Sequence, residues 1–181
     1  MKLTSLSIPD LKVIEPQIFN DDRGYFFESF NQEKFNKLLD LDYKFVQDNQ
    51  SMSTRGVIRG LHYQREPFSQ GKLVRVLSGE VYDVALDIRK NSQNFGQWQG
   101  IYLSEKNKKQ LWIPPGFAHG FVVTSDEAVL AYKVTKYFSK KHEGVIKYDD
   151  DFLSIPWPEN KFKKISSKDS LGISFEKFKT L

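Results

Sequence analysis

The sequence predicts an all-β protein built as a double-sheet jelly roll, with short helices near the N- and C-termini. Most of the chain consists of short runs rich in β-branched and aromatic residues. Turn residues such as Ser78-Gly79 and Pro114-Pro115-Gly116 separate these runs at fairly regular intervals, and helical periodicity is rare. Many short strands with little helix are typical of jelly rolls and related barrels, whose interior can hold a ligand.

The expected strands share this enrichment, and further turns are marked by Asp22-Arg23-Gly24 and Asn94-Phe95-Gly96. In chain order they lie at residues 12–19, 25–30, 45–52, 58–64, 72–77, 81–88, 98–103, 110–113, 121–124, 128–137 and 144–148.

Two segments depart from the strand pattern. Asn31 can cap a short helix, because its side chain can accept a hydrogen bond from a free N–H group of the first turn. Apolar residues then follow on one face at positions 35, 38 and 39. Near the other end, apolar residues at positions 173, 175 and 178 have a spacing that can dock a terminal helix.

The length favours one compact unit. A chain of 181 residues with 39% hydrophobic content can bury about 70% of the surface that its unfolded form exposes. We therefore expect one cupin-like domain over residues 1–181.

Charge and cysteine content narrow the function classes. The net charge of +4 comes without a basic block of the kind that signals a nucleic-acid arm, so no nucleic-acid partner is expected. A phosphate-bearing small molecule fits this charge as well as a polyanion does. The absence of cysteine excludes disulfides, thiol nucleophiles and thiolate metal sites. The N-terminus lacks the apolar run of a signal peptide, and no segment is apolar enough to cross a bilayer. We expect a cytoplasmic protein with no membrane partner.

Two motifs indicate a catalytic pocket. Gly-Val-Ile-Arg-Gly-Leu-His-Tyr-Gln spans residues 56–64 and is followed by Gln70-Gly71-Lys72, and Pro-Pro-Gly-Phe-Ala-His spans residues 114–119. A barrel can bring the two histidines and the lysine of these segments to one cavity.

The same motifs argue against a metal. A metal-binding cupin typically carries Gly, five residues, His-x-His and a nearby Glu, and later Pro-x-Gly-x-x-His. Here His62 stands at the right distance from Gly56 and His119 completes the later half, but Gln64 replaces the second histidine. A glutamine carbonyl is a poor ligand for such metals, so no metal site is expected.

The chain resembles the nucleoside-diphosphate 4-keto-6-deoxy-sugar 3,5-epimerases over nearly its whole length. Matching segments include Asp22-Arg23-Gly24-Tyr25-Phe26-Phe27-Glu28, Gln47-Asp48-Asn49, Arg59-Gly60-Leu61-His62-Tyr63-Gln64, Gln70-Gly71-Lys72-Leu73-Val74-Arg75, Gly116-Phe117-Ala118-His119-Gly120-Phe121, Tyr132-Lys133, Glu143 and Ser167-Lys168-Asp169. The resemblance implies a jelly-roll homodimer that binds a nucleotide sugar. It also implies a reaction, without a cofactor, at the two carbons that flank a ketone. The chain departs from the pattern of the rhamnose-pathway members at residues 146–151.

Inversion next to a ketone requires a base, an acid on the opposite face and a cation near the enolate oxygen. By resemblance, His62 is the base, Tyr132 the acid and Lys72 the group that holds the enolate, while Asp169 orients His62. From the residues alone, Asp169 also fits a capping box that begins at Ser166, and an isolated tyrosine on a strand is usually packing.

The remaining matched positions are expected to bind substrate. Arg23 and Arg59 suit the diphosphate, because guanidinium groups pair with phosphate oxygens. The other expected contacts to sugar or nucleotide are Glu28, Gln47, Asn49, His119, Glu143 and Lys168. His119 can alternatively satisfy buried backbone groups, and His142, in a charged turn, is expected to be solvated.

The favoured function is epimerisation at carbons 3 and 5 of a nucleoside-diphosphate 4-keto-6-deoxy sugar, for surface polysaccharide synthesis. The expected conversion is of the type that takes dTDP-4-dehydro-6-deoxyglucose to dTDP-4-dehydrorhamnose. Two alternatives keep the chemistry: a GDP-linked 4-keto heptose as substrate, or inversion at one carbon only. Others are a sugar-nucleotide-binding or lectin-like cupin without turnover, and a metal cupin oxygenase.

Overall fold

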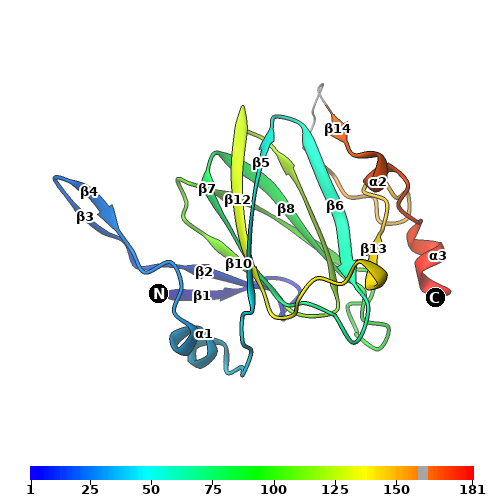
Figure 1. The fold of residues 1–181 in the computed structure, drawn as a ribbon, viewed down its shortest axis with the longest axis horizontal. Coiled ribbons are helices and arrows are strands. Elements are labelled where there is room, and N and C mark those ends of the chain that lie inside the picture. Colours follow the sequence, from blue (N-terminus) through cyan, green and yellow to red (C-terminus); the bar gives the residue numbers. More distant parts are fainter. Residues whose placement is uncertain (159–162) are drawn as a thin grey trace.

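The computed structural model describes residues 1–158 and 163–181 and consists mainly of two facing antiparallel sheets (Figure 1). The strands of the first sheet, in spatial order, are β1 (Lys2–Ser5), β2 (Lys12–Glu15), β10 (Gln110–Ile113), β7 (Lys72–Ser78), β12 (Glu127–Val134) and β5 (Gln47–Thr54). Those of the second are β13 (Glu143–Val145), β6 (Val57–Gln64), β11 (Phe117–Val123), β8 (Glu80–Asp87) and β9 (Trp98–Ser104), with β14 (Lys164–Ile165) parallel to β6.

The chain passes back and forth between the two sheets. β5, β7, β10 and β12 belong to the first sheet, whereas β6, β8, β9, β11 and β13 belong to the second. Strands that follow each other along the chain therefore mostly face each other across the interior. This is the strand order of a double-sheet jelly roll, and it confirms the predicted fold class.

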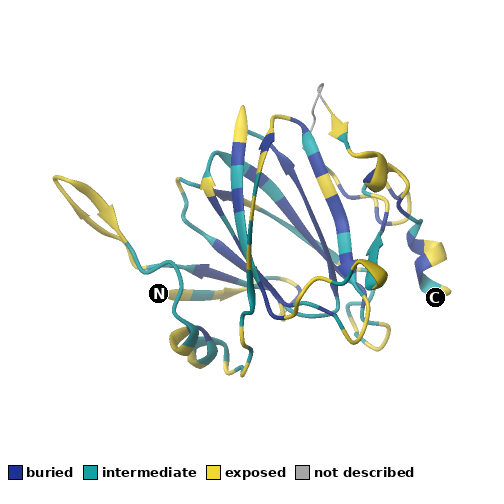
Figure 2. Ribbon diagram, in the orientation of Figure 1, coloured by how far each residue is buried: buried dark blue, intermediate teal, exposed yellow. Residues whose placement is uncertain are grey.

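The main core lies between the sheets. Alternate residues of each strand point inward, as the period of two in a strand requires. Val74 and Leu111 from the first sheet meet Val81 and Leu103 from the second, and all four are fully buried. Figure 2 shows the buried residues running along these strands. Burial on this inner face holds the sheets together.

The C-terminal segment covers the outer face of the second sheet. It carries the short helices α2 (Ser167–Ser170) and α3 (Phe175–Lys179). Phe175 and Phe178 of α3 are buried against Leu86 of β8 and Tyr63 of β6, and α3 lies beside the second sheet in Figure 1. The predicted terminal helix is confirmed, although it spans only five residues.

The N-terminal helix is also confirmed. α1 (Gln32–Leu39) begins after Asn31, whose side chain accepts a hydrogen bond from the Lys34 N–H group at 3.0 Å. Phe35 packs edge-on against Trp112 of β10, with ring centroids 5.2 Å apart. Before this helix, a separate hairpin of β3 (Phe19–Asp21) and β4 (Gly24–Phe26) projects away from the two sheets (Figure 1).

Several predicted strand boundaries are wrong. The segment 12–19 is not one strand, because Pro16 lacks the N–H group that would continue the ladder of β2. The strand expected at 121–124 begins at Phe117 and so includes His119. The strands expected at 25–30, 128–137 and 144–148 end early, at Phe26, Val134 and Val145 respectively. β1 and β14 were not predicted, because each is short and rich in polar residues.

Two glycines let β6 and β11 approach closely at a break in their register between His119 and Phe121. Gly60 has a φ of +120°. A Cβ atom on Gly60 would lie 2.5 Å from the Gly120 Cα atom and 2.6 Å from the His119 carbonyl oxygen. Both contacts are to backbone, so the strands would have to separate.

We predict that Gly60→Ala destabilises the fold much more than Gly24→Ala. Gly24 also has a left-handed φ, +129°, but a Cβ atom there meets nothing within 4 Å. Backbone strain of about 1–3 kcal/mol is common to both variants, and the collision at Gly60 adds about 1–3 kcal/mol. Urea unfolding of both variants measures the difference, and equal losses would contradict the close approach.

Candidate active site

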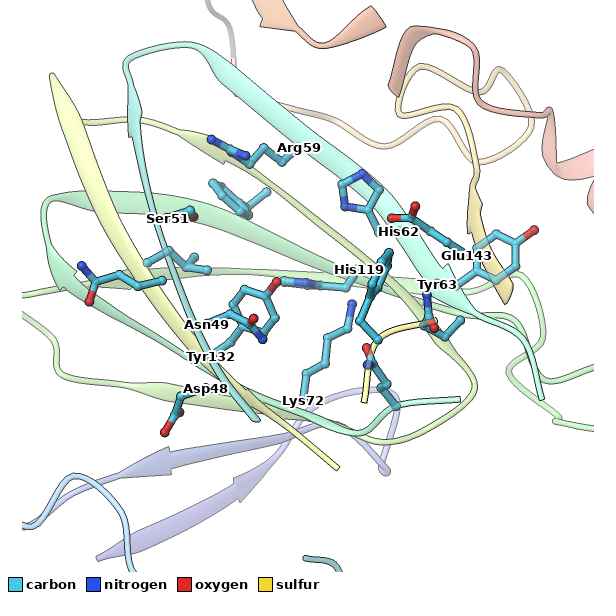
Figure 3. Close-up of a pocket in the computed structure, with 16 residues that line it drawn as sticks. Asp48, Asn49, Ser51, Arg59, His62, Tyr63, Lys72, His119, Tyr132 and Glu143 are labelled. Carbon is cyan, nitrogen blue, oxygen red and sulfur yellow. The ribbon is translucent and has the colours of Figure 1, made fainter. Parts of the chain in front are cut away.

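A cavity of about 530 Å³ opens between the two sheets, lined by residues of β5, β6, β7, β11 and β12. Figure 3 shows Lys72, His119 and Tyr132 gathered in the space between the sheets, with His62 on the wall formed by β6. The fold thus brings the histidines and the lysine of the two sequence motifs, together with Tyr132, to one cavity.

His62 is paired with a buried carboxylate. Its Nε2 atom lies 2.6 Å from Asp169 Oδ1, and the Gly60 N–H group donates to Asp169 Oδ2 at 3.3 Å. Burial alone would raise the pKa of Asp169, but the hydrogen bonds from His62 and Gly60, together with the charges of His62 and Lys168, outweigh burial and lower that pKa. Asp169 is therefore a carboxylate that can only accept hydrogen bonds.

Asp169 also has the capping role that the sequence allowed. Its backbone N–H group donates to the Ser166 side-chain oxygen at 3.1 Å, which begins α2. Its side chain turns to His62 instead of returning to the backbone of Ser166 as in a full capping box. The two readings of Asp169 are compatible, because they use different atoms.

Tyr132 lies on the opposite wall. It belongs to β12 of the first sheet, whereas His62 belongs to β6 of the second, and both line the cavity. Burial raises the pKa of the Tyr132 phenol, an effect that the nearby charge of Arg59 opposes and that of Glu143 reinforces. The phenol is therefore protonated at neutral pH.

Lys72 is buried at the start of β7, with 8% of its surface exposed. Burial lowers the pKa of Lys72 to about 8, against the opposing effects of Asp83 and then Glu143. The preceding Gly71 donates its N–H group to the Thr135 hydroxyl at 2.8 Å. This contact fixes the backbone at the point where Lys72 enters the cavity.

His119 pairs with a carboxylate and not, as one prediction had it, with buried backbone groups. Its Nε2 atom lies 3.0 and 2.9 Å from the two oxygens of Asp83 on β8. His119 is also the cross-strand partner of His62 in the β11–β6 ladder. Sequence reasoning missed Asp83, although an acidic residue at an inward position of an apolar strand was a usable signal.

The remaining predicted residues of the cavity region lie at its walls. Arg59 lines the cavity and donates from Nε to the Ser53 hydroxyl at 3.0 Å. Asn49 lines it too and accepts a hydrogen bond from Gln47 at 2.7 Å. Glu143 is a third lining residue. Outside the lining, Lys168 forms an ion pair with Glu143.

Four predicted binding residues do not line this cavity. Gln47 and Lys168 contact residues that do, Asn49 and Glu143 respectively, whereas Arg23 and Glu28 belong to other parts of the chain. Arg23 sits at the tip of the β3–β4 hairpin with 85% of its side chain exposed, and its guanidinium pairs with Asp21 at 2.5 Å. Glu28 pairs with Lys34 at 2.9 Å near α1. Within one chain the hairpin points away from the two sheets (Figure 1).

Some cavity residues were not predicted. Asp48, Ser51, Gln70 and Phe138 also line the space. Phe138 remains 53% exposed, so it lies at the rim. The sequence gives little indication that Phe138 lines the cavity. Tyr137-Phe138 follows closely after a strand, and aromatic residues at that position predict that the strand continues.

His142, which was expected to be solvated, is partly exposed. Its Nδ1 atom lies 2.8 Å from the Ser139 hydroxyl and its ring 4.5 Å from that of Phe68. The divergent segment 146–151 does not line the cavity. Within it, Ile146 is in the core, and Asp150 accepts hydrogen bonds from the Leu153 and Phe175 N–H groups at 3.1 and 2.8 Å.

The residues at the cupin metal position do not form a ligand set. Over residues 1–158 and 163–181, no three His, Cys, Asp or Glu side chains are grouped as metal ligands. His62 and His119 each direct Nε2 to a carboxylate. The side-chain oxygen of Gln64 accepts a hydrogen bond from the Ser139 N–H group at 2.9 Å.

Within the described parts of the chain, every helix is too short or too polar to span a lipid bilayer.

The jelly roll and this cavity define a cupin-like protein equipped for acid–base chemistry. The family model of dTDP-4-dehydrorhamnose 3,5-epimerase matches residues 5–177. The chain belongs to this family, which is a family of isomerases, and the resemblance found in the sequence is confirmed.

Individual members of this family are similar to the chain over nearly its whole length. The dTDP-4-dehydrorhamnose 3,5-epimerase of Shigella flexneri is 52% identical over 175 residues, or 97% of this chain and 96% of the relative. That of Salmonella typhimurium is 51% identical over 94% of this chain and 93% of the relative. The crystal structure of dTDP-6-deoxy-D-glucose-3,5-epimerase from Legionella pneumophila, in complex with dTDP-4-keto-L-rhamnose, has a TM-score of 0.94 and 49% identity. The match covers 97% of this chain and 93% of that one.

We predict that Lys72→Met stabilises the fold at pH 7 and that this gain shrinks with rising pH. Unfolded lysine keeps its proton to about pH 10, whereas folded Lys72 loses it near pH 8. The unfolded state therefore binds more protons between pH 8 and 10.5, and stability of the native protein rises across that range.

The expected gain at pH 7 is about 3 kcal/mol. Urea unfolding at pH 7 and pH 10 measures it, with Lys136→Met, at an exposed position, as the control. A Lys72→Met effect that is the same at both pH values would contradict the buried ammonium.

Proposed function

We propose that this protein converts dTDP-4-dehydro-6-deoxyglucose to dTDP-4-dehydrorhamnose by inverting carbons 3 and 5 without a cofactor. The observation that carries the proposal is the placement of the His62–Asp169 pair and Tyr132 on opposite walls of one cavity. Membership of the epimerase family supports the substrate.

His62 is the proposed base. The ketone at carbon 4 acidifies the hydrogens on carbons 3 and 5, so an imidazole can remove them. Since the Asp169 carboxylate can only accept, His62 Nε2 carries a hydrogen and Nδ1 keeps a free lone pair. The carboxylate also stabilises the imidazolium that forms when the proton arrives.

Tyr132 is the proposed acid. Inversion requires that the new proton reach the carbon from the face opposite to the base. A base on β6 of one sheet and a phenol on β12 of the other fit a sugar ring held between them. Because burial raises the pKa of Tyr132, the phenol keeps its proton until an enolate of higher basicity is present.

Lys72 is the proposed group that holds the enolate oxygen. Loss of the proton from carbon 3 or 5 moves negative charge onto the ketone oxygen. A compact ammonium stabilises that charge strongly where water is excluded. With its pKa near 8, Lys72 is mainly an ammonium at pH 7.

The nucleotide is proposed to occupy the rim of the cavity. Arg59 lines the cavity with an exposed guanidinium and suits the diphosphate. Phe138 offers an exposed aromatic ring on which a base can stack. Gln47, Asn49, His119, Glu143 and Lys168 remain the proposed contacts to sugar and nucleotide.

We further propose that the protein is a homodimer of one-domain subunits and acts in the cytoplasm, in surface polysaccharide synthesis. The β3–β4 hairpin exposes Phe19, Tyr25 and Phe26, with 55%, 58% and 69% of their surfaces accessible. An apolar projection of this kind is typical of an interface. In a dimer it could bring Arg23 and Glu28 to the partner's cavity, where their predicted binding roles apply.

The alternatives are less well supported. A GDP-linked heptose or a single inverted carbon would use the same side chains, but the relatives described above are named as dTDP-sugar 3,5-epimerases. A binding protein without turnover needs neither a His–Asp pair nor an opposed phenol.

We predict that turnover in heavy water places deuterium on both carbons that flank the ketone. NMR of dTDP-4-dehydro-6-deoxyglucose incubated with the enzyme measures it, and a GDP-linked 4-keto sugar is the control substrate. His62→Ala should lower kcat by about 10²–10⁴, with the fold unchanged by circular dichroism. Deuterium at one carbon would favour single epimerisation, and none at either would refute the proposal.

Tyr132→Phe should separate proton removal from inversion. The base still forms the enolate, but without the phenol the proton returns from the side of His62. We therefore expect deuterium exchange with retained configuration, at a rate within about tenfold of the wild type, while formation of epimerised product falls by about 10²-fold or more. If exchange and inversion fall equally, Tyr132 is not the acid.

A further inference from the structure

A second histidine–carboxylate pair lies beside the proposed base, and its carboxylate, Asp83, has no role in the mechanism above. Asp83 points into the space between the sheets from β8, with none of its surface exposed. Both its oxygens are within 3.0 Å of His119 Nε2. Across the described residues, this ring nitrogen is the one hydrogen-bond donor that reaches the Asp83 carboxylate.

The contact determines which nitrogen of His119 carries hydrogen. A carboxylate can only accept, so Nε2 is the N–H atom and Nδ1 has the free lone pair in the neutral ring. Burial lowers the pKa of His119; Asp83 opposes this effect, while Lys72 and His62 add to it. A neutral His119 therefore presents a hydrogen-bond acceptor at Nδ1.

Asp83 also balances the charge at the base of the cavity. Lys72 is buried, and the carboxylate of Asp83 is the strongest influence that keeps its proton in place. A buried ammonium without a nearby anion tends to lose its proton, because desolvation disfavours the charged form. Asp83 thus acts on two cavity side chains, His119 and Lys72, although it does not line the cavity itself.

We propose that Asp83 is a positioning residue for the epimerisation, which holds His119 in its Nε2–H tautomer. This inference rests on the proposed function and extends it. His119 Nδ1 then accepts a hydrogen bond from a hydroxyl of the sugar, which orients the ring between His62 and Tyr132.

Asp83→Asn tests the proposal with little change in shape. The asparagine amide can donate to His119 Nε2, which would shift the hydrogen to Nδ1 and present a donor where the sugar needs an acceptor. An Asp→Asn change of this kind next to a histidine can cost about 10⁴-fold in kcat through the wrong tautomer. We expect kcat to fall by about 10²-fold or more, with KM changed less than about threefold.

Asp87→Asn is the matched control. Asp87 lies on the same strand, is also fully buried, and accepts from the Arg89 side chain and the Ser92 hydroxyl, away from the cavity. Its substitution should lower the free energy of unfolding and leave kcat near wild type. Asp83→Glu keeps the acceptor and should recover more activity than Asp83→Asn.

Nitrogen-15 NMR of the histidine rings gives a readout that a merely structural role would not change. The wild type should show His119 with hydrogen on Nε2, and Asp83→Asn should show it on Nδ1. Hydrogen on Nδ1 in the wild type, or wild-type kcat in Asp83→Asn, would overturn the proposal.

The ring spectra need no substrate, so they remain decisive if the proposed sugar is not turned over. Should Asp83→Asn fail to fold, the wild-type spectrum and the activity of Asp83→Glu decide, and a Glu variant no more active than His119→Ala would count against the proposal.

Discussion

The contact between His62 and Asp169 joins parts of the chain 107 residues apart and depends on most of the fold. His62 is held by β6, which pairs with β13 on one side and β11 on the other, and Asp169 by a short capped helix outside that sheet. Gly60 connects the two through its N–H group. The carboxylate is almost fully buried, so its charge is stabilised by these hydrogen bonds and not by water.

The jelly-roll order explains why acid and base can face each other. Because successive strands alternate between sheets, side chains from distant parts of the sequence enter the cavity from opposite sides. The cavity borders the apolar core, to which the buried residues Val74, Val81 and Leu130 belong. Such surroundings lower the pKa of Lys72 and raise that of Tyr132, each through loss of solvation. Packing and reactivity therefore have the same physical origin.

Much of the fold could be predicted, because hydrophobic alternation and turn residues are local signals. The strands around His62 and Lys72 were found within one residue of their limits. The start of β11 was not, since Pro-Pro-Gly-Phe-Ala-His-Gly has little strand preference of its own. That segment is a strand because β6 and β8 pair with it on both sides.

The site was predictable only in part, for a similar reason. His62, Lys72 and Tyr132 stand in recognisable motifs, and the structure brings all three to one cavity. Asp83 stands at an inward position of an apolar strand, but its partner His119 belongs to another strand, and the sequence alone does not show that these two strands pair. Arg23 and Glu28 were predicted by resemblance alone, which does not show where residues lie in space, and neither lines the cavity.

The position of Asp169 on a helix outside the sheets has a consequence for proteolysis. All strands of the two sheets except the short β14 precede residue 146, whereas Asp169 follows it. A protease that cut the connection between them, and released the C-terminal piece, would leave the barrel strands uncut, expose the face that Phe175 and Phe178 cover, and deprive the imidazole of its carboxylate. Immunoblots that detect the barrel segment would then overstate the amount of working protein.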